Sequence, residues 1–140
     1  MYSSRTRLAL IVLETSAAIE LLLNLPLSME VQKHIERHQW HIVAPQLLTI
    51  EVLQVLRRRV HRELTCLTDA EEAIALLGDL GIHYYDHQLL ATRVWTMRDS
   101  LTAYDACYAA LAEATSADLL TCDRRMANAH GIQARIILVE

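Results

Sequence analysis

Four acidic residues of this sequence are spaced so that their carboxylates could meet: Glu14, Glu51, Asp105 and Asp123. Carboxylates that share a water-poor pocket raise one another's pKa values, and protons or cations must compensate the charge. Oxygen ligands with few histidines or cysteines beside them favour Mg²⁺ or Mn²⁺ over zinc. Such ions can activate water and stabilise the leaving oxygen of a phosphodiester. The four residues therefore predict metal-assisted hydrolysis without a protein nucleophile, provided that the fold brings them together.

Residues 101–125 contain two of these acids and suggest how they meet. Thr102 is expected to cap a helix of mostly small residues, which places Asp105 in the first turn. The chain should then turn and come back as a short strand, residues 118–121, that leads to Asp123. Helix starts and the carboxyl ends of parallel strands are where open α/β sheets bind ligands. The two carboxylates are therefore expected to be neighbours.

The other two acids belong to elements nearer the start of the chain. Residues 8–13 are an unbroken apolar run, typical of a strand covered on both faces, and the first acid follows directly. Thr15 or Ser16 is expected to cap the next helix. Glu51 lies on the inward apolar stripe of a helix expected at residues 46–62. A charge that points inward in this way needs a partner.

Strands and helices are expected to alternate along the whole chain. Further strands are predicted at residues 40–43, 82–85 and 134–139, and helical segments lie between them. Alternation of this kind favours an α/β fold, in which helices cover both faces of a parallel sheet.

Composition limits the class of protein. At 140 residues, with 53% hydrophobic side chains, the chain is expected to form a single domain over residues 1–140, with 1–7 as a flexible leader. The net charge of −4 argues against a general polyanion binder with a basic surface. Three cysteines without a CxxC pair suit the reducing cytoplasm. Acids interrupt the apolar stretch at residues 8–27, so no membrane span is expected.

Four blocks of the sequence resemble PIN-domain proteins, in particular the VapC-like toxins of bacterial toxin–antitoxin systems. They are LIVLETSAAIELLL, APQLLTIEVLQVLRR, TAYDACYAALAE and LLTCDRR, which together cover essentially the whole chain. The resemblance implies a three-layer α/β/α sandwich with a central, mostly parallel sheet. It also implies an endoribonuclease that depends on Mg²⁺ or Mn²⁺, with Glu51, Asp105 and Asp123 as ligands and Ser16 and Thr121 as supporting polar groups.

The first acid of the family pattern is normally Asp, whereas this chain has Glu14. Glutamate keeps the charge and adds one methylene, so Glu14 is still expected to act as a metal ligand. The alternative prediction is a PIN-like module that binds RNA or an antitoxin without cutting, because of this replacement. The resemblance implies three partners: an RNA substrate, a small VapB-like antitoxin and a second copy of the chain. Operator DNA is expected to be reached only through the antitoxin.

Basic side chains near the acids leave other interpretations open. Arg98 and Arg124 are expected to support the site or contact RNA, although Arg98 could instead pair with one of the acids. His34 and His38 share a helix face, but they lack the HExxH order and a nearby cysteine, so they do not indicate a zinc site. A phosphorylated receiver-like regulator needs a lysine beside the acids, and Lys33, the only lysine, lies on that same helix.

Overall fold

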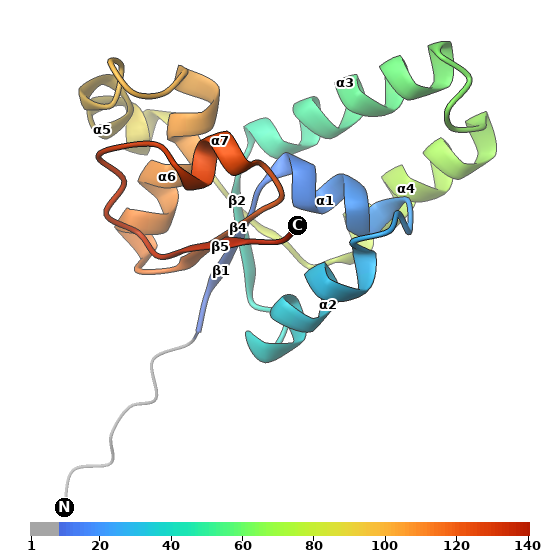
Figure 1. Ribbon diagram of the computed structural model, residues 1–140, viewed down its shortest axis with the longest axis horizontal. Coiled ribbons are helices and arrows are strands. Elements are labelled where there is room, and N and C mark those ends of the chain that lie inside the picture. The colour runs from blue at the N-terminus through green and yellow to red at the C-terminus, as the bar shows by residue number, and fades with distance from the viewer. Residues whose placement is uncertain (1–8) are drawn as a thin grey trace, which may run out of the picture.

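A computed structural model describes residues 9–140, so the leader expected at residues 1–7 lies outside the described residues. Its centre is a five-stranded sheet in the order β3-β2-β1-β4-β5, and every neighbouring pair is parallel. The strands are β1 (Ile11–Leu13), β2 (Ile42–Pro45), β3 (His83–Tyr85), β4 (Asp118–Thr121) and β5 (Ile136–Leu138). The expected parallel sheet is therefore confirmed, with β1 in its middle (Figure 1).

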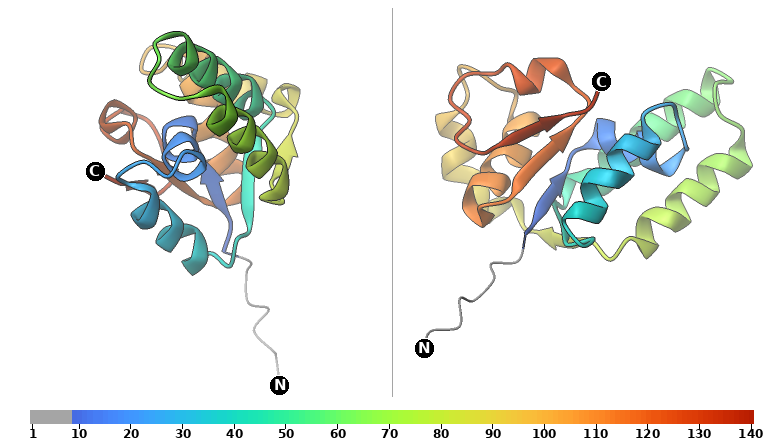
Figure 2. Two further views of the ribbon diagram at one scale, coloured as in Figure 1. Left: turned by 90° about the vertical axis from the view of Figure 1, so that its right-hand side faces the viewer. Right: turned by 60° about the horizontal axis from the view of Figure 1, so that its bottom comes forward.

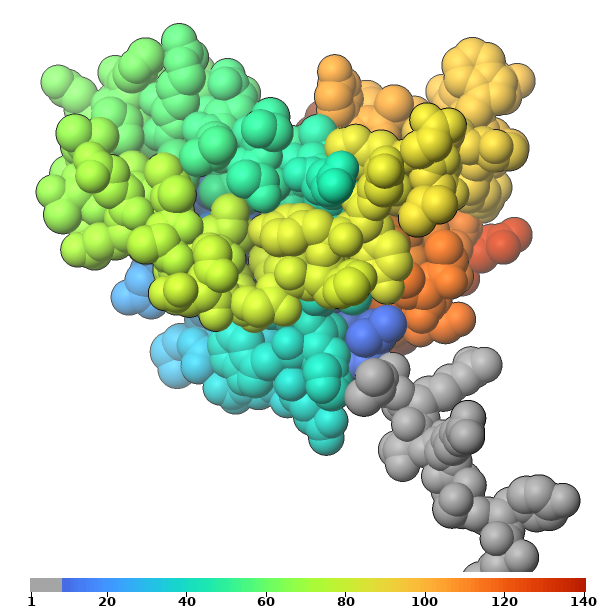
Figure 3. Space-filling model, turned by 180° about the vertical axis from the view of Figure 1, so that it is seen from behind, coloured from blue at the N-terminus to red at the C-terminus, as the bar shows by residue number. Residues whose placement is uncertain are grey.

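Helices cover both faces of the sheet, which confirms the α/β sandwich. The α-helices are α1 (Thr15–Leu22), α2 (Ser28–Arg37), α3 (Leu47–His61), α4 (Leu67–Asp79), α5 (Ala91–Thr96), α6 (Ala103–Thr115) and α7 (Arg124–Ala127), with a 3-10 helix η1 (His87–Leu90) before α5. Helices α5 and α6 lie on one side of the sheet, and α1 and α2 lie on the other (Figure 2). Helices α3 and α4 pack side by side and, with β3, form the back of the molecule (Figure 3).

The core explains why β1 and α6 occupy the centre. All three residues of β1 are fully buried, as expected for a central strand covered on both faces. Helix α6 buries a series of alanines, and their small side chains let its backbone lie close to the sheet. Thr102 caps this helix, since its Oγ1 accepts a hydrogen bond from the backbone N–H of Asp105 at 3.2 Å. Asp105 therefore sits in the first turn, as predicted.

Two local predictions were wrong. Glu14 caps α1 in place of Thr15 or Ser16, because its carboxylate accepts a hydrogen bond from the backbone N–H of Ser16. The strand expected at residues 40–43 is displaced to Ile42–Pro45, because Trp40 has a φ of +60° and belongs to a turn. Within residues 9–140, no helix is both long and apolar enough to cross a membrane.

Candidate active site

The carboxyl edge of the sheet brings the predicted acids together. Glu14 directly follows β1, and Asp123 follows the neighbouring strand β4 by two residues. Asp105 comes from the first turn of α6, and Glu51 comes from the second turn of α3. The upper side of Figure 1 shows these element ends converging above the sheet. Four segments far apart in sequence thus deliver carboxylates to one region, as parallel α/β topology predicts.

Glu14 is held by three hydrogen bonds to a single oxygen. Its Oε2 accepts from the backbone N–H of Ser16 at 2.9 Å, from the Ser16 hydroxyl, and from Thr121 Oγ1 at 2.8 Å. These bonds anchor the long side chain to its own helix start and to β4. Burial raises the pKa of Glu14, the bonds to Ser16 and Thr121 oppose this, and Asp105 raises it further. Ser16 and Thr121, which were predicted as supporting groups, thus lie beside the first acid.

Glu51 is held by two hydroxyl groups that were not predicted as its partners. Its Oε1 accepts a hydrogen bond from Tyr108 at 2.5 Å and another from Thr15 Oγ1 at 2.8 Å. Burial, and then the bond to Glu51, raises the pKa of Tyr108, so the phenol keeps its proton and remains a donor. The inward charge on α3 therefore has polar partners, which are hydroxyls and not the arginine considered from the sequence.

Asp105 and Asp123 form the more open half of the site. Burial raises the pKa of Asp105 first, and the neighbouring charges of Asp123 and Glu51 raise it further. Asp123 Oδ1 accepts a hydrogen bond from the backbone N–H of Arg125 at 2.9 Å and so caps α7. The Arg125 side chain lies 3.6 Å from the same oxygen but is 93% exposed, so it compensates this charge only weakly.

A groove of about 550 Å³ runs beside the acids between α1 and α3. Glu14 and Glu51 line it, and so do the cationic side chains of Arg58, Arg59 and Arg125. Asp105 and Asp123 are not among its lining residues and border the site from α6 and from the start of α7. The groove is therefore lined by both acidic and basic side chains, which suits a ligand that carries phosphates near a cation.

The two arginines singled out from the sequence are engaged outside this groove. The guanidinium of Arg98 stacks on the Trp95 ring at 4.8 Å and donates to the Trp95 carbonyl at 3.1 Å. Arg124 pairs with Glu140, and this bond raises the pKa of Arg124. Arg58, Arg59 and Arg125 are the cations that line the groove instead. Arg58 and Arg59 lie in the last turn of α3, where cations also interact favourably with the helix dipole.

The donor set fits a hard divalent cation in charge and in chemistry. Four carboxylates lie near one another, and the pKa values of Glu14 and Asp105 are raised partly by the other acids. A cation that neutralises this repulsion would be favoured, and oxygen donors suit Mg²⁺ or Mn²⁺. Within residues 9–140, however, no three acidic, histidine or cysteine side chains are arranged closely enough to hold an ion. The chemical type of these ligands therefore fits such an ion, but their spacing does not. The carboxylates would have to move closer together to bind it.

Tyr108 and Thr15 are the site residues that sequence reasoning missed. Tyr108 lies three residues after Asp105, so both side chains project from one face of α6. That spacing was the available signal, but an aromatic residue at helical spacing is also typical of a core position. Thr15 was interpreted only as a helix cap, because its partner Glu51 is 36 residues away.

Comparisons with known proteins show which family and fold this chain is similar to. The family model for the PIN domain matches residues 11–132. Ribonuclease VapC12 of Mycobacterium tuberculosis is 33% identical over 132 residues, which are 93% of this chain and 99% of that protein. The crystal structure of PAE2754 from Pyrobaculum aerophilum has a TM-score of 0.63 at 20% identity and covers 91% of this chain and 90% of that one. VapBC2 from Rickettsia felis, bound to a promoter DNA fragment, has a TM-score of 0.63 at 12% identity and covers 94% and 99%.

Proposed function

This chain belongs to the PIN-domain family, and from that premise we propose that it is an endoribonuclease that acts as the toxin of a toxin–antitoxin pair. The relative at 33% identity is named a ribonuclease and is covered over almost its whole length. The observation that carries the proposal is the meeting of four carboxylates at the carboxyl edge of the sheet, where two of their pKa values are raised. Phosphodiester hydrolysis is the chemistry that such a cluster supports best.

We propose Glu14, Asp105 and Asp123, together with Glu51, as the residues that would hold Mg²⁺ or Mn²⁺. When bound, an ion of this kind activates water and compensates the negative charge that develops at the phosphate. Ser16 and Thr121 support this arrangement because they fix one oxygen of Glu14. The second carboxylate oxygens of Glu14, Glu51 and Asp123 accept no hydrogen bond from the described residues, so each of these acids keeps an oxygen available for the ion.

RNA is proposed to follow the groove between α1 and α3. Arg58, Arg59 and Arg125 line this groove and can attract phosphates toward the acids by charge. Local cations are needed here, because the chain as a whole has a net charge of −4. Contacts of Arg98 and Arg124 with RNA stay predictions, and each side chain would first have to leave its present partner.

The proposed partners follow from the relatives. We propose that a small VapB-like antitoxin binds this chain in the cytoplasm and that two copies of the chain form a dimer. The Rickettsia felis neighbour was solved as a VapBC2 complex with promoter DNA. For this chain we propose that operator DNA is reached only through the antitoxin, since the net charge is negative.

A second candidate is a PIN module that binds RNA or the antitoxin but no longer cuts. It is favoured by the absence of a preassembled group of three metal-binding side chains within residues 9–140. It is also favoured by Glu14, whose carboxylate serves as a helix cap on one oxygen. Glu14→Asp separates the candidates: a noncutting wild type whose cleavage is restored by this substitution would favour the second.

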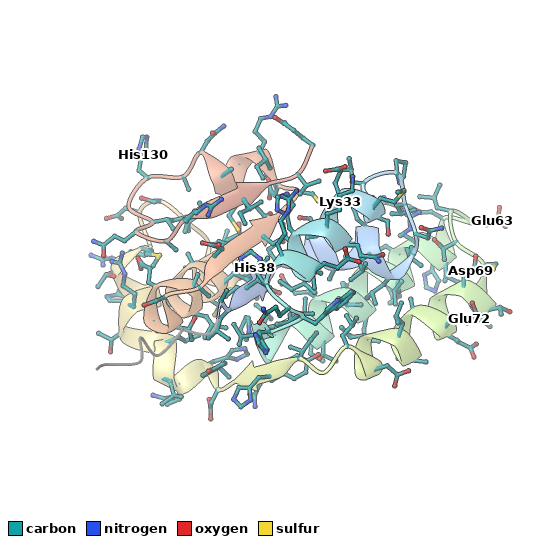
Figure 4. The ribbon with its side chains drawn as sticks, turned by 90° about the horizontal axis from the view of Figure 1, so that it is seen from below. Lys33, His38, Glu63, Asp69, Glu72 and His130 are labelled. Carbon is teal, nitrogen blue, oxygen red and sulfur yellow. The ribbon has the colours of Figure 1, made fainter. Side chains whose placement is uncertain are left out.

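Cleavage of RNA by the purified full chain tests the proposal. We expect cleavage of total RNA with Mn²⁺ or Mg²⁺ and none with EDTA, and Asp105→Asn should abolish it while the fold is retained by circular dichroism. Asp69→Asn makes the same chemical change on α4, where the side chain is exposed at the far end of the molecule (Figure 4), and should cleave normally. Equal cleavage by the wild type and Asp105→Asn would show that cleavage does not depend on this carboxylate and would remove the support for this site.

A further inference from the structure

The hydroxyl of Tyr108 is buried against one of the four carboxylates. The side chain is fully buried in the core under α6, and its hydroxyl donates to Glu51 Oε1 at 2.5 Å. A hydroxyl inside an apolar core costs free energy unless it is hydrogen-bonded. An apolar side chain could fill the same volume without this cost. The presence of a phenol here therefore needs an explanation beyond packing.

Thr15 completes a triangle of oxygen atoms with these two residues. Its Oγ1 lies 2.8 Å from Glu51 Oε1 and 2.8 Å from the Tyr108 hydroxyl. An ionised carboxylate can only accept, so the two hydroxyl protons must serve the contacts: Tyr108 donates to Glu51, and Thr15 donates to Glu51 or to the phenol oxygen. Three elements meet at this point, because Thr15 starts α1, Glu51 comes from α3 and Tyr108 comes from α6.

The triangle occupies one oxygen of Glu51 and leaves the other available. Oε1 lies within hydrogen-bond distance of both hydroxyls, whereas Oε2 accepts no hydrogen bond from the described residues. Glu51 also lines the groove. A glutamate that is fixed before binding has already lost the side-chain freedom that a mobile one would lose on binding. Fixing the side chain also favours one geometry of the reacting groups over its alternatives.

We propose that Tyr108, supported by Thr15, is a positioning residue that orients Glu51, so that Oε2 is the oxygen presented to the groove. This inference rests on the proposed function, because the groove is taken as the place where RNA is cut. Tyr108 itself acts through Glu51 and touches neither substrate nor ion. The competing explanation is that Tyr108 only fills the core and that its hydroxyl is satisfied by the nearest acceptor.

A double-mutant cycle separates the two explanations. The proteins are the wild-type full chain, Tyr108→Phe, Glu51→Gln and the double variant, and kcat and KM are measured on an RNA oligonucleotide with Mn²⁺. We expect Tyr108→Phe to lower kcat by about ten- to a hundredfold with little change in KM, because the carboxylate loses its orientation. In the Glu51→Gln background the same substitution should change kcat by less than about twofold. Equal losses in both backgrounds would overturn the proposal.

Matched variants control for loss of a phenol or a hydroxyl elsewhere. Tyr85→Phe removes a hydroxyl from a half-buried ring on β3 that packs edge-on against His83, and it should leave kcat unchanged. Thr15→Val should lower kcat, whereas Thr15→Ser keeps the hydroxyl and should retain most of the activity. If Tyr108→Phe does not fold, this Thr15 pair decides, and equal activity of its two variants would overturn the proposal.

Calorimetric titration with Mn²⁺ alone distinguishes failure of the positioning from failure of the proposed function. Tyr108→Phe should weaken Mn²⁺ binding several-fold in the wild-type background and leave it unchanged in the Glu51→Gln background. A wild type that binds Mn²⁺ but cleaves no RNA would remove the proposed function, and the binding cycle would still test Tyr108. Equal Mn²⁺ affinities of the wild type and Tyr108→Phe would overturn the positioning, even with an active nuclease.

Discussion

The two ends of β4 carry the same residue type in opposite electrostatic surroundings. At the amino end, Asp118 Oδ2 lies 2.8 Å from His38 Nε2 and 3.8 Å from Arg135. The other ring nitrogen of His38 lies 2.6 Å from the carbonyl of His34, so both nitrogens face oxygen acceptors. Figure 4 shows His38 beside the amino edge of the sheet, between α2 and β4. At the carboxyl end, Asp123 faces Asp105, and each acid has other acids as neighbours.

The volumes of the neighbouring pockets do not distinguish the two ends of β4. The hollow beside His38 and Asp118 measures about 590 Å³, and the groove beside Glu14 and Glu51 measures about 550 Å³. Charge does distinguish them, because folding supplies partners at the amino end and leaves acids facing acids at the carboxyl end. Charged groups that have a partner of opposite charge in the fold contribute to stability. Like charges that the fold places close together point instead to a site that binds a ligand of opposite charge.

The sharpest test of this contrast is the loss of one carboxylate at each end. We expect Asp123→Asn to lower kcat for RNA cleavage by about a hundredfold or more, because the arrangement of the acids is disturbed. Asn still caps helices well, so α7 should persist. Asp118→Asn makes the same change five residues earlier on the chain and should leave kcat nearly unchanged under conditions in which the protein stays folded. Equal losses for the two variants would show that the ends do not differ in function.

The free energy of unfolding should respond to the same two substitutions in the opposite order, with the larger loss for Asp118→Asn. Asp118→Asn removes the charged partner of His38, which is 8% exposed, and should lower the free energy of unfolding by about 1.5–3 kcal/mol. Asp123→Asn removes a like charge beside Asp105 and should not lower the stability of the metal-free protein. Urea unfolding in EDTA measures both. A larger loss for Asp123→Asn would mean that the acidic end is stabilised without a cation.

The smallest expected effect is a pH dependence of the metal-free protein. The pKa values of Glu14 and Asp105 are raised by folding, chiefly by burial. Their contribution to stability is therefore fully present below about pH 4 and is lost as the pH rises through the raised values. In EDTA, Asp105→Asn should thus have a higher Tm than the wild type at pH 7.5, and this difference should disappear below about pH 4. A difference that does not change with pH would contradict the ionised, buried carboxylate of Asp105 as its cause.

Much of the fold, and the positions of the acids at the edge of the sheet, could be predicted from local patterns. The strand at residues 118–121 and the cap at Thr102 lie where they were expected, because an apolar run and a capping residue act over a few neighbouring positions. Parallel topology then placed Glu14 and Asp123 at one edge, since they follow adjacent strands. The turn at Trp40 was missed because a positive φ at a nonglycine residue depends on its tertiary surroundings.

The sequence by itself determined that Glu14 and Asp123 follow strands and that Asp105 lies in the first turn of a helix, because strand ends and helix starts follow from periodicity and short-range chemistry. Only the tertiary structure decided what each acid touches. Thr15, Glu51 and Tyr108 are separated by 36, 57 and 93 residues in their three pairings, and a hydrogen bond over such distances leaves no periodic pattern. The same holds for His38 and Asp118, 80 residues apart, whose pairing gives the acid at the amino end of β4 a partner.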